Sequence, residues 1–373
     1  MSSINNLDTD FKTLHINDTH LQDVTINRLN YIGSKYLLFD WIFNHILSIT
    51  KWNSLENKHI ADLFSGTGFV SYYFRKNKAI VTSNDAELYS YYITHAYTCS
   101  IYTDNCHSII KMLNDEINEQ KYINFIGFIT RMYSPYHNNT RMFFTLDNAK
   151  RIDYIRNRIE ELKTTLNDDE YKFLLASLIF SADSISNVPA VYGCYLKKFK
   201  PKSLKNMKLI PIHTIKDTKI NGSITYNKDA ITLAQNLDKV DLVYLDPPYN
   251  ERQYSKNYFP LNIIALTPTE QNNLPPLKGI TGIPQNCFIS TFCKKNETVK
   301  DSFDKLISSL NTEWIFISYN SESIIKKDDM INLLSKYGTV TLYQKDYKRF
   351  KSFSYNEDKS IDEYLFCLKL YDK

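Results

Sequence analysis

The chain has 373 residues, of which 43% are hydrophobic and 23% charged, so it is long enough to bury a large core and to form two domains. Its net charge of +4 excludes a polybasic tail, and an acidic partner would have to meet positive charge gathered on one face. No stretch approaches the roughly 20 apolar residues of a membrane span, the N-terminus lacks the apolar core of a secretion signal, and the six cysteines include no Cys-x-x-Cys pair. We therefore expect a cytoplasmic protein with reduced thiols, no metal site and no membrane contact.

The N-terminal part of the chain predicts the opening of an α/β fold. A polar lead-in, residues 1–21, precedes a helix expected over 35–49 with Ser34 as its cap. A strand, a glycine loop, a helix and a second strand follow, at 60–64, 65–68, from 69, and at 79–83. This order is typical of the first half of a nucleotide-binding domain.

The rest of the chain predicts a helical insertion and a return to strands. Helical patterns fill residues 96–221, most clearly over 147–163, and strands are expected at 223–226, 240–245, 314–318, 339–344 and 364–370. Residues 267–300 contain four prolines and no clear period, which indicates a loop. The simplest architecture is one α/β domain, 22–95 and 222–373, interrupted by a largely helical insertion, 96–221.

The loop after the first strand has the features of a nucleoside site. Gly66 and Gly68 are two of only nine glycines in the chain, and glycine lets the backbone approach a ligand closely, although a simple tight turn would also explain them. The third glycine of a dinucleotide fingerprint is replaced by Ser71, whereas Asp85 lies 23 residues beyond Asp62, a spacing that suits an acid bound to ribose hydroxyls. A ligand with one nucleoside, such as S-adenosylmethionine (SAM), therefore fits better than NAD.

The sequence Asp246-Pro247-Pro248-Tyr249 follows the apolar strand expected at 240–245. Two consecutive prolines cannot continue a β-ladder, so the strand ends there, at the edge of an α/β sheet where ligands bind. The turn presents a carboxylate, the free carbonyl of Pro247 and an aromatic ring, a set that fits a planar base with an exocyclic amine. We predict an enzyme acting on an amino group of a nucleobase, with a capped strand-ending turn as the alternative.

These motifs resemble, in order along the chain, those of the α-class, Dam-like N6-adenine DNA methyltransferases, and in particular the FokI-type modification enzymes of type II restriction–modification systems. The resemblance runs from about residue 28 to 369. It is carried by the segments Asn-Tyr-Ile-Gly-Ser-Lys at 30–35, Asp-Leu-Phe-Ser-Gly-Thr-Gly at 62–68, Asn-Asp at 84–85, Tyr-Asn-Lys-Asp-Ala at 226–230, Asp-Pro-Pro-Tyr-Asn-Glu-Arg-Gln-Tyr at 246–254 and Ser-Tyr-Asn at 318–320.

The resemblance implies a Rossmann-like, SAM-dependent methyltransferase sheet with an inserted target-recognition domain, and methyl transfer to N6 of an adenine flipped out of duplex DNA. The residues that it implies for binding the cofactor SAM are Tyr31, Gly33, Lys35, Asp62, Phe64, Gly66, Gly68, Asp85 and Asp229. Those that it implies for catalysis are Asp246, Pro247, Pro248 and Tyr249, with Tyr249 stacking on the base and Tyr319 as a second candidate for stacking.

Basic and aromatic residues near these motifs are candidates for binding DNA, with ordinary solvated surface as the alternative. Lysines recur from 197 to 208, a second basic run spans 345–351, and two arginines of the insertion would suit the reading of guanine. The candidates are Arg131, Arg141, Lys197, Lys198, Lys200, Arg252, Tyr254, Lys348 and Arg349.

Two other functions remain open from the sequence. An RNA N6-adenine methyltransferase would use the same catalytic turn, and a catalytically silent DNA-binding protein could retain the same fold. We expect a monomer whose cognate restriction endonuclease, where one exists, acts on the same site without forming a stable complex. The recognition sequence and the adenine that is modified cannot be deduced.

Overall fold

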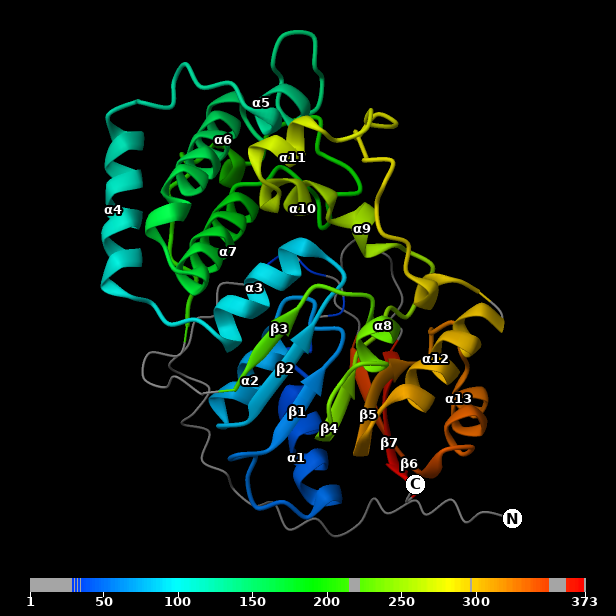
Figure 1. Ribbon diagram of the computed structural model, residues 1–373. Helices are drawn as coiled ribbons and strands as arrows, with labels where there is room; N and C mark the ends of the chain where they lie inside the picture. Colours follow the sequence, from blue (N-terminus) through cyan, green and yellow to red (C-terminus); the bar gives the residue numbers. More distant parts are fainter. Residues whose placement is uncertain are drawn as a thin grey trace.

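A seven-stranded sheet flanked by helices forms one part of the protein, and a group of helices lies beyond one edge of that sheet (Figure 1). The computed structural model describes residues 29, 31, 33, 35–214, 222–295, 297–348 and 360–371. The predicted lead-in, residues 1–21, lies outside the described residues. No described helix is both long enough and apolar enough to cross a membrane.

The sheet has the strand order β3-β2-β1-β4-β5-β7-β6, and its direction of winding reverses between β1 and β4. Five strands run parallel: β1 His59–Asp62, β2 Ile80–Asn84, β3 Ile224–Tyr226, β4 Val240–Leu245 and β5 Thr312–Asn320. Two antiparallel strands, β7 Ser360–Leu370 and β6 Gly338–Lys348, complete it. The predicted strands are confirmed to within a few residues, and the reversal creates a crevice at the carboxyl ends of β1 and β4.

Helices cover both faces of the sheet because its central strands are apolar on both sides. In β4, Leu242 and Tyr244 belong to one buried cluster, whereas Val243 and Leu245 belong to another. The first cluster includes α1 Phe39–Thr50 and α2 Phe69–Lys76, and α3 Leu88–Thr98 also packs there. The second includes α8 Ala230–Ala234, α12 Glu297–Ser309 and α13 Lys327–Leu334.

The helix predicted over 35–49 starts four residues later, at Phe39. Residues 36–38 form a turn instead, in which the Leu38 N–H donates to the Lys35 carbonyl at 3.0 Å. Leu38 occupies the N-cap position and makes no side-chain cap, and the predicted cap, Ser34, lies outside the described residues. The turn closed by this bond occupies the residues that the prediction gave to the first turn of the helix, and Lys35 before it is buried in an ion pair described below.

The helical part is built from two separate stretches of sequence. The insertion supplies α4 Asp104–Asn118, α5 Phe128–Tyr133, α6 Leu146–Glu161 and α7 Asp168–Ser184. After the catalytic motif, the chain returns through α9 Tyr254–Asn257 and adds α10 Phe259–Ala265 and α11 Pro268–Asn272, which pack against α5 and α6 (Figure 1). The predicted insertion, 96–221, therefore omits two helices that lie in the same layer.

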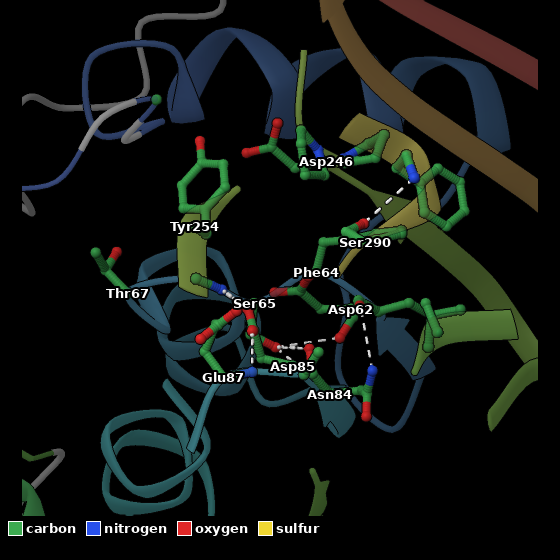
Figure 2. Close-up of a pocket in the computed structure, with 18 of the residues that line it drawn as sticks. Asp62, Phe64, Ser65, Thr67, Asn84, Asp85, Glu87, Asp246, Tyr254 and Ser290 are labelled. Atoms are coloured by element: carbon green, nitrogen blue, oxygen red, sulfur yellow. Dashed lines mark hydrogen bonds between the residues drawn. The ribbon is translucent and has the colours of Figure 1, made fainter. Parts of the chain in front are cut away.

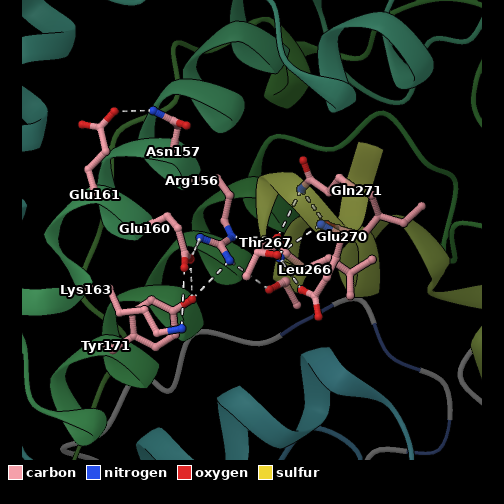
Figure 3. A network of polar contacts seen from close by, with 12 residues as sticks. Arg156, Asn157, Glu160, Glu161, Lys163, Tyr171, Leu266, Thr267, Glu270 and Gln271 are labelled. Carbon is pink, nitrogen blue, oxygen red and sulfur yellow. Dashed lines mark hydrogen bonds and ion pairs between the residues drawn. The ribbon is translucent and has the colours of Figure 1, made fainter. Parts of the chain in front are cut away.

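A buried arginine holds these two stretches together (Figure 3). Arg156, on α6, is ion-paired with Glu160 at 3.0 Å and donates from Nε to the Leu266 carbonyl, just after α10, at 2.9 Å. The Tyr171 hydroxyl of α7 accepts from Arg156 at 3.2 Å and donates to Glu160 at 2.7 Å. Because Arg156 is almost completely buried, it functions as an internal cap for the end of α10.

The prediction of a loop over 267–300 is wrong in part. It contains α11, the single 3₁₀ turn Thr291–Cys293 and the start of α12. A capping box formed by Thr267 and Glu270, with Pro268 in the first turn, starts α11. These elements are too short to produce a detectable periodicity in the sequence.

Candidate active site

A pocket of about 930 Å³, counting the part open to solvent, lies at the carboxyl ends of β1, β2 and β4 (Figure 2). Every residue predicted for catalysis lines it, as does every residue predicted for the cofactor except Gly68. The predicted residues on its wall are Tyr31, Gly33, Lys35, Asp62, Phe64, Gly66, Asp85, Asp229, Asp246, Pro247, Pro248 and Tyr249. The chain thus brings segments from residue 31 to residue 249 into one site.

The glycine loop is held by the acid at the end of the next strand. The Gly66 N–H donates to Asp85 Oδ2 at 2.7 Å, and the Glu87 N–H donates to Asp85 Oδ1 at 2.9 Å. Gly66 has a φ of 53°, and a Cβ there would lie 2.8 Å from the Tyr31 hydroxyl, so no other residue fits without movement. Gly68 instead packs against α3, where a Cβ would lie 2.8 Å from the Thr94 hydroxyl.

Asp62 presents an unused oxygen to the pocket. Its side chain is buried at the end of β1, and Oδ2 accepts from the Ser71 hydroxyl at 2.6 Å. Oδ1 is buried without a hydrogen-bond partner among the described residues. Burial raises the pKa of Asp62 to about 7, and the bond from Ser71 opposes the shift. A ligand with a positive charge or an N–H group would satisfy the unused oxygen.

Glu87 is a pocket residue that sequence reasoning missed. It stands at the N-cap position of α3, and its side chain accepts from the amide of Asn262 on α10. Burial, reinforced by the nearby charge of Asp85, raises the pKa of Glu87 to about 8, so its carboxyl is largely protonated at neutral pH. Asp85 itself has a pKa raised by burial to about 6. The only signal in the sequence that could have identified Glu87 is its position two residues after Asp85.

The catalytic turn is organised around one oxygen of Asp246. Lys35 Nζ lies 2.9 Å from Asp246 Oδ1, and the Tyr249 hydroxyl donates to the same oxygen. Lys35 also donates to the Gly33 carbonyl at 3.1 Å, and its ammonium lies 4.7 Å from the centre of the Tyr249 ring. Burial raises the pKa of Asp246, whereas the charge of Lys35 lowers it. The ion pair therefore opposes the protonation of Asp246 that burial favours.

Aromatic rings complete the wall of the pocket. Tyr31 stacks on Tyr258 with ring centres 4.9 Å apart, and Tyr254 lies beside both rings. Phe64 meets Phe292 edge to face at 5.0 Å. These rings provide an apolar surface of the kind on which a planar base packs.

The remaining pocket residues were not predicted for the cofactor or for catalysis, although several lie within the quoted motif segments and Tyr254 was predicted for DNA. The Ser290 N–H donates to Gln253 Oε1 at 2.8 Å, and Gln253 Nε2 donates back to the Ser290 carbonyl at 3.1 Å, so the loop before α12 is joined to the catalytic turn. The others are Leu63, Ser65, Thr67, Phe69, Val70, Asn84, Ala86, Ala230, Tyr244, Tyr254, Phe288 and Phe292. Asp229, which was predicted, caps α8 by accepting from the Ile231 and Thr232 N–H groups at 3.0 and 3.1 Å.

The residues predicted to bind DNA differ in how far they are exposed. Lys197, Lys198 and Arg252 are exposed, and Tyr254 is half-buried in the pocket wall. Lys200 is half-buried and donates to the Val188 carbonyl, and burial lowers its pKa. The side chain of Lys348 and all of Arg349 lie outside the described residues.

The two arginines predicted to read bases make internal contacts. Arg131 donates to the Ile126 carbonyl at 3.1 Å and to the Asn272 side chain at 2.8 Å. Arg141 donates to the Met132 carbonyl at 3.2 Å and to the Ile280 carbonyl at 2.9 Å. Their guanidinium groups join segments of this chain, a use that the sequence alone does not reveal.

The described residues contain no group of three or more His, Cys, Asp or Glu side chains arranged to hold a metal ion. The pocket instead combines a glycine loop, a buried acid at the end of β2, a buried oxygen without a partner among the described residues, and a carboxylate beside a tyrosine ring. This set is suited to hold a nucleoside at one end and a second planar group at Asp246 and Tyr249.

Residues 31–333 match the family model described as D12 class N6 adenine-specific DNA methyltransferase. The type II methyltransferase M.CviAII of Paramecium bursaria Chlorella virus 1 is 44% identical over 341 residues, which cover 91% of this chain and 98% of that protein. M.NlaIII of Neisseria lactamica is 36% identical, covering 87% of this chain and 93% of that protein, and M.FokI of Planomicrobium okeanokoites is 34% identical, covering 91% and 52%. The methyltransferase fold and the family expected from the sequence are confirmed, and the chain belongs to the D12 class of N6 adenine-specific DNA methyltransferases.

Proposed function

We propose that this protein is the modification enzyme of a type II restriction–modification system, which transfers a methyl group from SAM to N6 of an adenine flipped out of a specific duplex site. The observation that carries the proposal is the position of Asp246, with the Pro247 carbonyl and the Tyr249 ring, in the same pocket as the glycine loop. The relatives named above, two of which match this chain over more than nine-tenths of their own length, are described as type II methyltransferases.

The residues of the pocket fit SAM as the methyl donor. Oδ1 of Asp62, which is buried without a partner in the described part of the chain, suits the ammonium group of the methionine moiety. Asp85, at the carboxyl end of β2 and on the wall of the pocket, suits the ribose hydroxyls. When bound, SAM supplies an electrophilic methyl group on a positively charged sulfur.

The chemistry assigned to the protein is to make N6 of adenine a better nucleophile. The N6 lone pair is delocalised into the ring, so the nitrogen needs acceptors for its two hydrogens as it becomes tetrahedral and positively charged. The Pro247 carbonyl is one acceptor. Asp246 Oδ2 is the other, since the contacts of Asp246 with Lys35 and Tyr249 use Oδ1. The charge of Lys35 favours the ionised form of Asp246, and Tyr249 provides the surface on which the base stacks.

The DNA is assigned to exposed basic residues of the helical part and of the loop that follows Tyr249. Exposed lysines at 197, 198, 205 and 208 can neutralise phosphates, and exposed Arg252 follows the catalytic turn directly. Lys200, Arg131 and Arg141 are left out of this surface because they already bond to groups inside the protein. Their removal would act on the fold before it acted on DNA.

The test is nucleoside mass spectrometry of varied duplex DNA after incubation with the protein and SAM. N6-methyladenine should appear with the intact protein and fall by roughly 10²-fold or more with Asp246→Ala, because an acceptor for the developing charge is lost. Sequencing the modified DNA then gives the recognition site. Equal methylation by both proteins would refute the assigned role of Asp246.

Two further arms test the rival functions. Transfer to RNA but not to DNA would replace the duplex with RNA as the substrate. A protein that failed to bind SAM in calorimetry, while still binding DNA, would be a catalytically silent reader of DNA. Asp246→Ala serves as the control in both arms, because it should retain SAM binding.

A further inference from the structure

The segment between α11 and the pocket carries an unusually exposed apolar residue. Residues 273–290 leave the helical layer at α11 and return to the catalytic side of the sheet (Figure 1, yellow). Ile280 lies on this segment with 81% of its side chain exposed, more than any other large hydrophobic residue in the described part of the chain. A singly exposed isoleucine is common on protein surfaces, so the meaning of this one depends on how its backbone is held and on what surrounds it.

The turn that carries Ile280 is firmly anchored. The backbone groups of Lys278 and Ile283 bond to each other at 2.8 and 2.9 Å, and glycines with φ of 69° and 75° occupy positions 279 and 282. A turn closed by paired backbone bonds holds its tip residue in a defined place. The tip is therefore part of the folded structure.

Side chains of the helical part hold the same turn from within. The Arg141 guanidinium donates to the Ile280 carbonyl at 2.9 Å and to the Gly279 carbonyl at 3.4 Å. The buried Tyr133 hydroxyl donates to the Gly282 carbonyl at 2.7 Å. Three hydrogen bonds, two from Arg141 and one from Tyr133, bind the backbone of the turn, while the isoleucine side chain is left in solvent.

The other end of the segment is joined to the catalytic turn. The Ser255 hydroxyl donates to the Phe288 carbonyl at 2.6 Å, and Ser290 exchanges two hydrogen bonds with Gln253. Phe288 and Ser290 line the pocket itself. One continuous segment thus connects the exposed turn to the site of methyl transfer.

The charge of the segment suits a polyanion, although Lys295 at its end is ion-paired with Glu251 at 2.6 Å. Residues 271–295 contain three lysines, at positions 278, 294 and 295, and no aspartate or glutamate. Lys278 is exposed at the base of the turn, two residues from Ile280. An apolar tip beside a lysine, on a segment free of acids, is more suited to nucleic acid than to an average protein surface.

We propose that the Lys278–Ile283 turn enters the DNA duplex, and that the Ile280 side chain fills the space that the extruded adenine leaves in the base stack. Enzymes that extrude a base must offset the loss of stacking, and apolar side chains inserted between base steps do so in other DNA-binding proteins. Arg141 then acts as a positioning residue, since it bonds to the turn that enters the DNA. The inference rests on the proposed transfer to a flipped adenine.

The experiment compares Ile280→Ala with the unchanged protein on two duplexes that contain the mapped site. In one the target adenine is paired, and in the other it stands opposite an abasic position and is already weakly held. On the paired duplex, methylation by Ile280→Ala should slow by roughly tenfold; on the abasic duplex it should stay within about twofold of the unchanged protein. With 2-aminopurine at the target position, binding should give a clearly smaller fluorescence rise for the variant.

The matched control is Ile123→Ala, another exposed isoleucine, with 43% exposure, in the turn after α4. It should behave as the unchanged protein on both duplexes. Equal slowing of Ile280→Ala on both duplexes, or no slowing on the paired one, would overturn the proposal. So would a changed oligomeric state with normal methylation, which would assign the residue to protein association. Activity of the unchanged protein on the paired duplex tests the proposed function separately.

Discussion

The ion pair between Lys35 and Asp246 should set the pH range in which the enzyme works. The side chains are only 3% and 17% exposed, and Nζ lies 2.9 Å from Oδ1. At that distance the attraction is about 1.4 kcal/mol at a dielectric constant of about 80, and about 6 kcal/mol at about 20. Since about 1.4 kcal/mol corresponds to one pKa unit, removing the charge in Lys35→Met should raise the pKa of Asp246 by at least about one unit.

A protonated Asp246 is a weaker acceptor for the hydrogens of N6, so methyl transfer is lost as the pH falls through the pKa of this carboxyl. The acidic limb of the profile should therefore move to higher pH in Lys35→Met, and part of the lost rate should return in alkaline buffer. The assay is single-turnover methylation of a cognate duplex with saturating SAM between about pH 5 and about pH 9.

The control for this prediction is Lys78→Met. Lys78 forms an ion pair of similar length with Glu56, at 3.1 Å, but the two side chains are 63% and 53% exposed, so its removal should leave the profile unchanged. A Lys35→Met enzyme whose acidic limb coincides with that of the unchanged protein, at a lower plateau, would refute the electrostatic reasoning. Lys35 would then contribute through the packing of its side chain and not through its charge.

Three further predictions follow from the same structure. Because burial raises the pKa of Asp62 to about 7, the affinity for SAM measured by calorimetry should fall as the pH drops below about 7. Asp62→Asn should bind SAM more weakly and lose this pH dependence. If the variant kept the pH dependence, another group would be its source. In the folded protein Glu87 has a pKa of about 8, against an ordinary value of 4.5, so its contribution to folding is complete below about pH 4.5 and is lost as the pH rises toward 8. In urea unfolding between pH 5 and pH 9, the free energy of unfolding of Glu87→Gln should therefore rise relative to that of the unchanged protein. A constant difference between the two proteins would argue against a protonated Glu87. Lys197→Ala should weaken binding to every DNA sequence and reduce the slope of the logarithm of the affinity against the logarithm of the salt concentration by about one. Lys200→Ala loses a bond to the Val188 carbonyl and should leave that slope unchanged. Equal slopes for the two variants would mean that Lys197 does not contact DNA.

Local chemistry explains which parts of the fold could be predicted. Strand β4 is an apolar run closed by two prolines, and both signals lie within ten residues, so its bounds were predicted to the residue. The catalytic turn and the glycine loop were predictable for the same reason: the residue types themselves carry the chemistry. The start of α1 was not, because its position depends on an ion pair of Lys35 with a residue more than 200 positions away.

Long-range pairing explains what could not be predicted in the site. Glu87 meets Asn262 across 175 positions, and Gln253 meets Ser290 from a segment without any period. The contacts of Arg141 could not be predicted for a further reason. Its sequence position does not show whether a guanidinium faces solvent or a carbonyl of its own chain, and only the folded turn at Gly279 and Ile280 decides that.

The two-part construction of the helical layer has a consequence for engineering new sequence specificity. A chimaera that exchanged only the contiguous insertion would place a foreign α6 and α7 against the native α10, and the carbonyl of Leu266 would lose the guanidinium that Arg156 supplies. That carbonyl would keep only its long bond from Gln271 Nε2, at 3.4 Å, so the graft would lose the shorter of the two bonds that join α6 to the end of α10. Modules for exchange between members of this family should therefore be cut as a pair, with the stretch from α10 to the end of α11 transferred together with the insertion.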